Sequence, residues 1–141
     1  MDRTRASSWI RHGALQERPL GLGLAVQTEG ETLVVALVGA MDLESSPAAR
    51  AIILDCVDRE RDVLVDLRGV RFLNSAGIAI LVEALQRARH RERCLELVVT
   101  NAAILRGLQL ARLDTIFAIH ETPSQALRAL PRRPPPSSAR A

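Results

Sequence analysis

"VLVDLRGVRFLNSAGIAILVEAL", residues 63–85, is the stretch of this 141-residue chain that decides its fold. It begins with a short apolar run, 63–67, which is typical of a buried strand. From Ser75 to about Arg89 the apolar residues recur at helical spacing, which predicts a helix with one buried side. A buried strand that leads through a short polar turn into such a helix predicts an α/β fold. The residues that the spacing places on the buried side of the helix are Ile78, Leu81, Val82 and Leu85.

Strand-like and helix-like segments alternate on both sides of this unit. Upstream, the apolar runs 22–28 and 32–41 are split by a short charged turn and predict a β-hairpin. Ser46, as a cap, and Pro47 predict the start of a helix. The element order predicts one α/β domain with a mixed, mostly parallel sheet, an N-terminal antiparallel hairpin and about four flanking helices. The remaining expected elements are strands at 94–100 and 115–119, a helix over 102–110 capped by Asn101, and a last helix from Pro123 to Leu130.

The charge is distributed unevenly along the chain. Residues 1–20 carry four arginines against two acidic residues, and residues 131–141 carry three arginines and no acid. Residues 21–130 carry 12 arginines against 14 acidic residues, a net charge of −2. We therefore expect a flexible N-terminal extension at 1–20, a folded domain at 21–130 and a disordered Pro/Arg-rich tail at 131–141.

Composition argues against several classes of function. The slightly acidic body and an aromatic content of only 2% argue against specific nucleic-acid binding. No apolar run reaches membrane-spanning length and the N-terminus has no secretion signal, so we expect a cytoplasmic protein without a membrane partner. Cys56 and Cys94 show no metal-ligand spacing with histidine, and we expect neither a metal nor a cofactor. Whether the two cysteines form a redox disulfide is left open.

Two catalytic motifs are only partly present. Gly21 and Gly23 resemble the start of a dinucleotide-binding loop, but they open a strand rather than a helix. Ser75 and Gly77 supply half of a nucleophile elbow, but Leu73 stands where that motif needs a glycine. His120 is available as a catalytic partner and nothing singles it out, so the sequence predicts a protein that is not an enzyme.

Ser75 has two interpretations. It is either a helix N-cap, a role that Asn74 would fill equally well, or a functional residue. The helix wheel places Ala76, Ala79 and Ile80 off the buried stripe, as a small apolar patch beside Ser75. Such a patch is either covered by a neighbouring segment or contacts a partner.

Asp42 directly follows the central strand. Because loops that follow parallel strands gather at one edge of the sheet, we expect Asp42 and Ser75 to share that edge. The alternative for Asp42 is a purely structural role in the turn "DLESS".

Three stretches, "LVGAMD", "VLVDLRGVRFLNSAGIAIL" and "LRGLQLARLDTIFAIHETPSQAL", together resemble the STAS domain of bacterial anti-sigma factor antagonists. The match runs in order through 22–130. The resemblance implies that Ser75 is the phosphorylated serine, and Gly39 and Asp42 match a Gly-x-x-Asp pattern of the family. Asn74 departs from the aspartate that the family usually has there. The partner-binding residues expected from the patch and the resemblance are Asp42, Asn74, Ser75, Ala76, Gly77, Ala79 and Ile80.

The resemblance also implies a mechanism. Such proteins bind an anti-sigma factor that is itself a serine kinase, and binding frees a sigma factor for transcription. Phosphorylation by the kinase breaks the complex, and a phosphatase resets it. The alternative is a STAS scaffold or regulatory subunit of another complex, such as a stress-signalling assembly or a phospholipid transport system.

Overall fold

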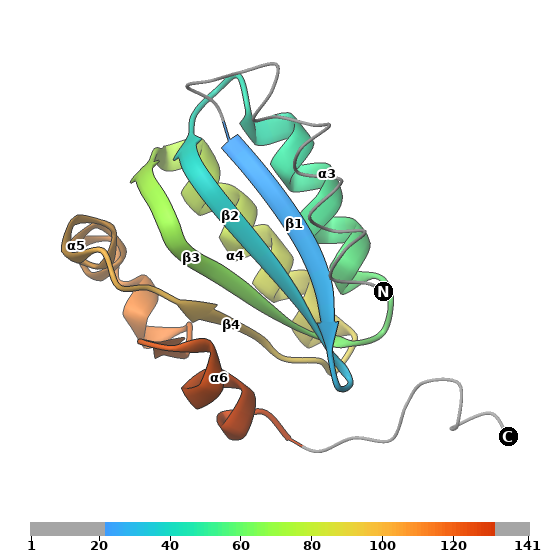
Figure 1. Ribbon diagram of the computed structural model, residues 1–141. Coiled ribbons are helices and arrows are strands. Elements are labelled where there is room, and N and C mark those ends of the chain that lie inside the picture. The colour runs from blue at the N-terminus through green and yellow to red at the C-terminus, as the bar shows by residue number, and fades with distance from the viewer. Residues whose placement is uncertain (1–21, 132–141) are drawn as a thin grey trace, which may run out of the picture.

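The computed structural model describes residues 22–131, so the expected extension at 1–20 and nearly all of the expected tail lie outside the described residues. Within this part the chain folds as one five-stranded sheet with helices on both faces (Figure 1). The strands are β1 (Leu22–Glu29), β2 (Thr32–Met41), β3 (Asp62–Leu73), β4 (Leu95–Val98) and β5 (Ile119–His120). The helices are α3 (Ser46–Val57), α4 (Ser75–His90), α5 (Ala102–Leu110) and α6 (Pro123–Ala129), with a 3₁₀ turn, η1 (Leu113–Thr115), before β5.

The sheet has the strand order β1-β2-β3-β4-β5. β1 pairs antiparallel with β2, and every later pair is parallel. The predicted α/β class, with a mostly parallel sheet that begins with an antiparallel hairpin, is therefore confirmed. The parallel order brings the carboxyl ends of β2, β3 and β4 to one edge of the sheet, where loops and helix N-termini meet.

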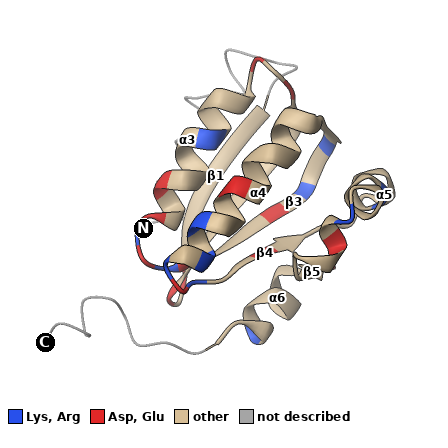
Figure 2. Ribbon diagram, turned by 180° about the vertical axis from the view of Figure 1, so that it is seen from behind, with Lys and Arg blue, Asp and Glu red and all other residues tan. Residues whose placement is uncertain are grey.

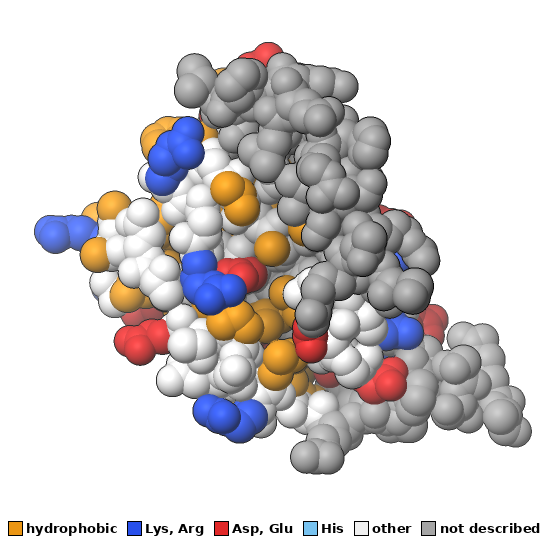
Figure 3. All heavy atoms as spheres, viewed as in Figure 1, with side chains coloured by type: hydrophobic (Ala, Val, Ile, Leu, Met, Phe, Trp, Pro, Cys, Tyr) orange, Lys and Arg blue, Asp and Glu red, His pale blue; other side chains and the backbone are white. Residues whose placement is uncertain are grey.

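The two faces of the sheet are covered differently. α3 and α4 run side by side behind the sheet in Figure 1 and enclose the main hydrophobic core with it. On the other face, α6 packs Ala126 against Val34, Leu64 and Val98. Figure 3 views this second face, where hydrophobic side chains are scattered among charged ones.

β3 is longer than the predicted strand at 63–67 and carries two irregularities. Ala36 pairs with Asp66 but Val38 pairs with Gly69, so β3 has one residue more than β2 between these pairs, and a second register shift follows. A Cβ atom on Gly69 would lie 2.9 Å from a Val38 methyl carbon, so the bulged strand approaches β2 closely only because this residue is glycine. The bulged part carries β3 to Leu73, directly before Asn74.

Two details of the predicted elements are wrong. Ser45, and not Ser46, occupies the N-cap position of α3, and its side chain makes no capping hydrogen bond there. Of the strand expected at 115–119, only Ile119 is in β5. The residues before it turn because Arg112 adopts a left-handed conformation with φ 62° and accepts a 2.6 Å hydrogen bond from the Thr115 hydroxyl.

Candidate functional site

The carboxyl ends of β2 and β3 lie side by side. Met41 pairs with Leu73 in the sheet, and the Asn74 backbone N–H donates a 3.3 Å hydrogen bond to the Met41 carbonyl. Asp42 directly follows Met41, and Ser75 directly follows Asn74. They therefore share one edge of the sheet, as the sequence predicted.

Asn74 is the N-cap of α4. Its backbone is extended, and its side-chain oxygen accepts a 2.9 Å hydrogen bond from the Gly77 N–H, which is the geometry of a helix cap. Ser75 is the first helical residue and is exposed. Its hydroxyl makes no hydrogen bond to any of the described residues, so the capping interpretation belongs to Asn74 alone. The fold leaves the Ser75 hydroxyl available for chemistry.

Asp42 is the centre of a tight turn between β2 and α3. One of its carboxylate oxygens, Oδ1, accepts hydrogen bonds from the Glu44 N–H at 3.0 Å, the Ser45 N–H at 2.9 Å and the Ser45 hydroxyl at 3.0 Å. The hydrogen bonds from Ser45 hold the pKa of the Asp42 carboxyl below its ordinary value, so the group is charged at neutral pH. Asp42 therefore stabilises the turn that follows β2, as the structural interpretation predicted. Its carboxylate also places a negative charge at the edge of the sheet that bears Ser75.

The prediction that Ile80 lies off the core is wrong. Its side chain is only 5% exposed and belongs to the main hydrophobic cluster. This side of α4 faces α3, because Glu83 binds Arg50 at 2.6 Å and Arg87 binds Asp58 at 3.1 Å. Figure 2 shows α3 and α4 side by side, with acidic and basic residues on both helices. The part of the expected patch that Ile80 forms is therefore covered by a neighbouring helix.

The other expected patch residues divide between fold and surface. Ala76 is half-buried and Ala79 is exposed. Gly77 is buried, and a Cβ atom there would lie 2.5 Å from a Leu73 methyl carbon and 2.6 Å from the Met41 sulfur. The absence of a side chain at Gly77 lets the first turn of α4 sit against the ends of β2 and β3. Gly77 positions Ser75 rather than offering a contact surface.

Two helical glycines give a matched test of this packing. We expect Gly77→Ala to lower the free energy of unfolding by about 1–3 kcal/mol, because Met41 is fully buried and has little room to move. Gly107→Ala is the control, since a Cβ atom on Gly107 meets nothing within 4 Å. This control should gain about 0.5–1 kcal/mol from helix propensity. Urea denaturation of both variants measures the difference, and a Gly77→Ala protein as stable as the control would contradict the packing argument.

Two exposed hydrophobic residues beside the site were missed by the sequence analysis. Leu43, in the Asp42 turn, is 77% exposed, and Phe72, at the end of β3, is 51% exposed. The sequence analysis placed Leu43 in the turn "DLESS" and Phe72 beyond the apolar run 63–67, and it assigned no surface role to either; the structure leaves both side chains exposed. Leu43 and Phe72 thus add exposed apolar side chains near the ends of β2 and β3, and Ala79 is the one residue of the expected patch that is exposed.

Other candidate residues are occupied or buried. His120 Nε2 lies 2.7 Å from a carboxylate oxygen of Glu96 on the neighbouring strand. Cys56 and Cys94 do not form a disulfide, and burial raises the pKa of the Cys56 thiol to about 11, so that it stays protonated and unreactive at neutral pH. Within residues 22–131 no group of three His, Cys, Asp or Glu side chains could hold a metal ion. None of the described helices combines the length and hydrophobicity needed to cross a bilayer.

Comparison with known proteins identifies the fold. An anti-sigma factor antagonist from Mycobacterium paratuberculosis superposes with a TM-score of 0.75 at 27% sequence identity, over 79% of this chain and 96% of that one. A putative anti-sigma factor antagonist from Thermotoga maritima gives a TM-score of 0.72 at 19% identity, over 77% and 95% of the two chains. The Bacillus cell fate determinant SpoIIAA in its phosphorylated form gives 0.61 at 16% identity, over 75% and 97%.

One of two sequence comparisons identifies the family. The search of curated proteins found no match. The family model described as "Mlab, STAS domain" matches residues 24–121, which is more than half of the chain and spans β1 to β5. The solved structures that resemble this chain are largely anti-sigma factor antagonists. The resemblance to the STAS domain that the sequence indicated is therefore confirmed. The chain belongs to the STAS domain family.

Proposed function

We propose that this protein is an anti-sigma factor antagonist controlled by phosphorylation of Ser75. In its unphosphorylated form it binds an anti-sigma factor with serine kinase activity in the cytoplasm and so frees a sigma factor. The kinase then phosphorylates Ser75 and the complex dissociates, and a phosphatase restores the binding form. The protein itself acts by binding and not as an enzyme.

The observation that carries the proposal is the state of Ser75. The residue is exposed at the first turn of a helix, and its hydroxyl has no structural duty among the described residues because Asn74 caps the helix. A modified serine can therefore be accommodated without loss of the fold. The likeness to SpoIIAA, which is known in phosphorylated and unphosphorylated forms, supports this assignment.

The geometry also supports a partner surface around Ser75. Leu43 and Phe72 expose large apolar side chains near the same edge, and Ala79 is exposed one turn along α4 from Ser75. Exposed apolar groups gathered at one place favour a protein contact. Asn74 and the charged Asp42, at the ends of the same two strands, would give the contact its polar part, and the half-buried Ala76 would add to its apolar part.

The direct test is affinity capture from native cytosol with the full chain as bait, followed by identification of the bound proteins. An anti-sigma factor with a kinase domain that transfers phosphate from ATP to Ser75 is the expected result. Peptide mass mapping locates the phosphate. Capture of subunits from a transport or stress-signalling assembly instead, without phosphate transfer, would favour the alternative role as a scaffold or regulatory subunit.

A further inference from the structure

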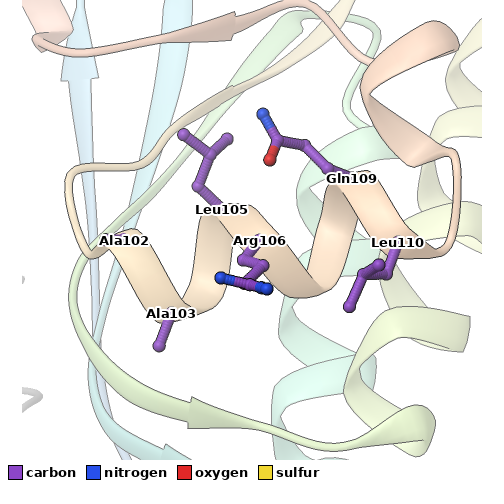
Figure 4. A pocket seen from close by; sticks show the side chains of 6 residues that line it. All are labelled: Ala102, Ala103, Leu105, Arg106, Gln109 and Leu110. Carbon is purple, nitrogen blue, oxygen red and sulfur yellow. The ribbon is translucent and has the colours of Figure 1, made fainter.

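The outward side of α5 exposes apolar side chains around a single arginine. The helix buries Ile104 and Leu108, whereas Leu110 on the opposite side is 78% exposed. A shallow hollow of about 680 Å³ lies along this outward side. Figure 4 shows Ala103, Arg106 and Leu110 on one flank of α5, with Leu105 and Gln109 on the other. The residues that line the hollow are Ala102, Ala103, Leu105, Arg106, Gln109 and Leu110.

Arg106 gives this hollow its only charge. It is exposed and makes no ion pair with any residue of the described range 22–131, whereas Arg50 and Arg68 on the same domain each bind a carboxylate. An arginine set among alanine and leucine side chains favours a partner that brings a carboxylate together with apolar groups.

The shape of the surface indicates what kind of segment fits it. Small side chains, Ala102 and Ala103, lie at the first turn of α5, and the bulky Leu110 lies at its last residue. An antiparallel helix with the same profile would place its own bulky residue over the two alanines and its small residues beneath Leu110. Close helix packing of this kind interlocks large and small side chains.

A second copy of the chain has that profile but the wrong charge. Arg106 is the middle residue of the nine-residue helix, so two antiparallel copies related by a two-fold axis would bring their Arg106 side chains together. Like charges that meet at the centre of such a contact oppose association. The surface therefore fits a different protein whose central residue is acidic.

We propose that the outward side of α5 binds a helix of a partner protein, with a carboxylate of that helix on Arg106 and its apolar side chains on Ala102, Ala103 and Leu110. This surface shares no residue with the site around Ser75 and adds a second docking site to the domain. The inference goes beyond the function proposed above, because it requires neither an anti-sigma factor nor phosphorylation.

Two synthetic stapled helices serve as probes of this surface. Both consist of alanine and glutamine with one leucine, and they differ only in the residue one turn before it, which is glutamate in one and lysine in the other. Titration into the ¹⁵N-labelled full chain should shift the amide signals of residues 102–110, with the glutamate helix binding on the order of fivefold more tightly. Equal affinity of the two helices, or shifts confined to other elements, would overturn the proposal.

Charge reversal on the protein provides the matched control. Arg106→Glu should invert the preference, so that the lysine helix binds more tightly. Arg128→Glu, which makes the same charge change on an exposed residue of α6, should leave the preference for the glutamate helix as in the wild type. Amide spectra that change only near the substituted residue show that both variants are folded. A preference for the glutamate helix that persists in Arg106→Glu would refute a site at Arg106. Equal loss of this preference in Arg128→Glu would assign the effect to net charge and would also refute the site.

Discussion

Ile80→Glu should unfold the domain. The side chain of Ile80 is 5% exposed and packs in the main core at the level where α4 meets α3. Replacing it with glutamate removes buried apolar volume, which costs about 2–5 kcal/mol, and places a carboxylate among buried apolar side chains. Small domains are stable by only about 5–15 kcal/mol in total, so we expect the variant to be largely unfolded and to show little or no cooperative thermal transition.

Ala79→Glu is the matched control, one residue away on the exposed side of the same helix. It introduces the same residue, glutamate, into the same helix, and it should change the free energy of unfolding by about 0.5 kcal/mol or less because the position is exposed. Circular dichroism melts of the two variants give the comparison. A cooperative Ile80→Glu melt at the wild-type temperature would mean that the α3–α4 contact does not form as described.

The error over Ile80 shows what a helical repeat in a sequence can and cannot predict. The four residues assigned to the buried stripe do face the core, but only Leu81 and Leu85 are fully buried. α4 is covered by the sheet on one side and by α3 on another, so its buried surface is wider than one stripe. A single repeat reports that a helix is buried, and it does not report how many neighbours bury it. The small residues Ala84 and Ala88, both buried, were the available sign of a second close neighbour.

The alternation of elements was predictable because it depends on periodicity, whereas local irregularity was not. The hairpin, the parallel order and the cap at Asn101 all follow from apolar spacing and turn residues, and the structure confirms them. The bulges of β3 depend on how Gly69 fits against Val38, a contact between distant segments. The expected strand at 115–119 failed because a short apolar run fits a strand or a buried turn equally well, and Phe117 enters the core from the turn.

The candidate site was predicted in position but not in composition. The shared edge for Asp42 and Ser75 follows from the parallel topology alone. Asn74 caps the helix because its side-chain oxygen accepts a hydrogen bond from the Gly77 N–H, and this leaves Ser75 exposed beside it. The sequence could not decide which of the two residues is the cap. Exposure of Leu43 depends on the turn geometry that Asp42 and Ser45 create.

Ser75→Asp should abolish partner binding while the fold stays intact. A phosphate adds about −1.5 to −2 charges at neutral pH, and aspartate reproduces part of that charge. In the free protein the charge meets water and the positive end of the α4 dipole, so the melting temperature should change little. In the complex the same charge must be desolvated beside Leu43 and Ala79, with the charged Asp42 carboxylate at the same edge.

An unpaired charge buried at an interface costs about 2–5 kcal/mol, so we expect the dissociation constant for the captured anti-sigma factor to rise by roughly thirtyfold or more. Ser75→Asn is the control, because asparagine matches aspartate in shape and lacks its charge, and Ser75→Ala removes only a hydroxyl that the fold does not use. Both should bind within a few-fold of wild type in calorimetric titrations. Equal loss of binding in Ser75→Asn would show that bulk rather than charge acts at this position, and tight binding by Ser75→Asp would remove the electrostatic basis for a switch at Ser75.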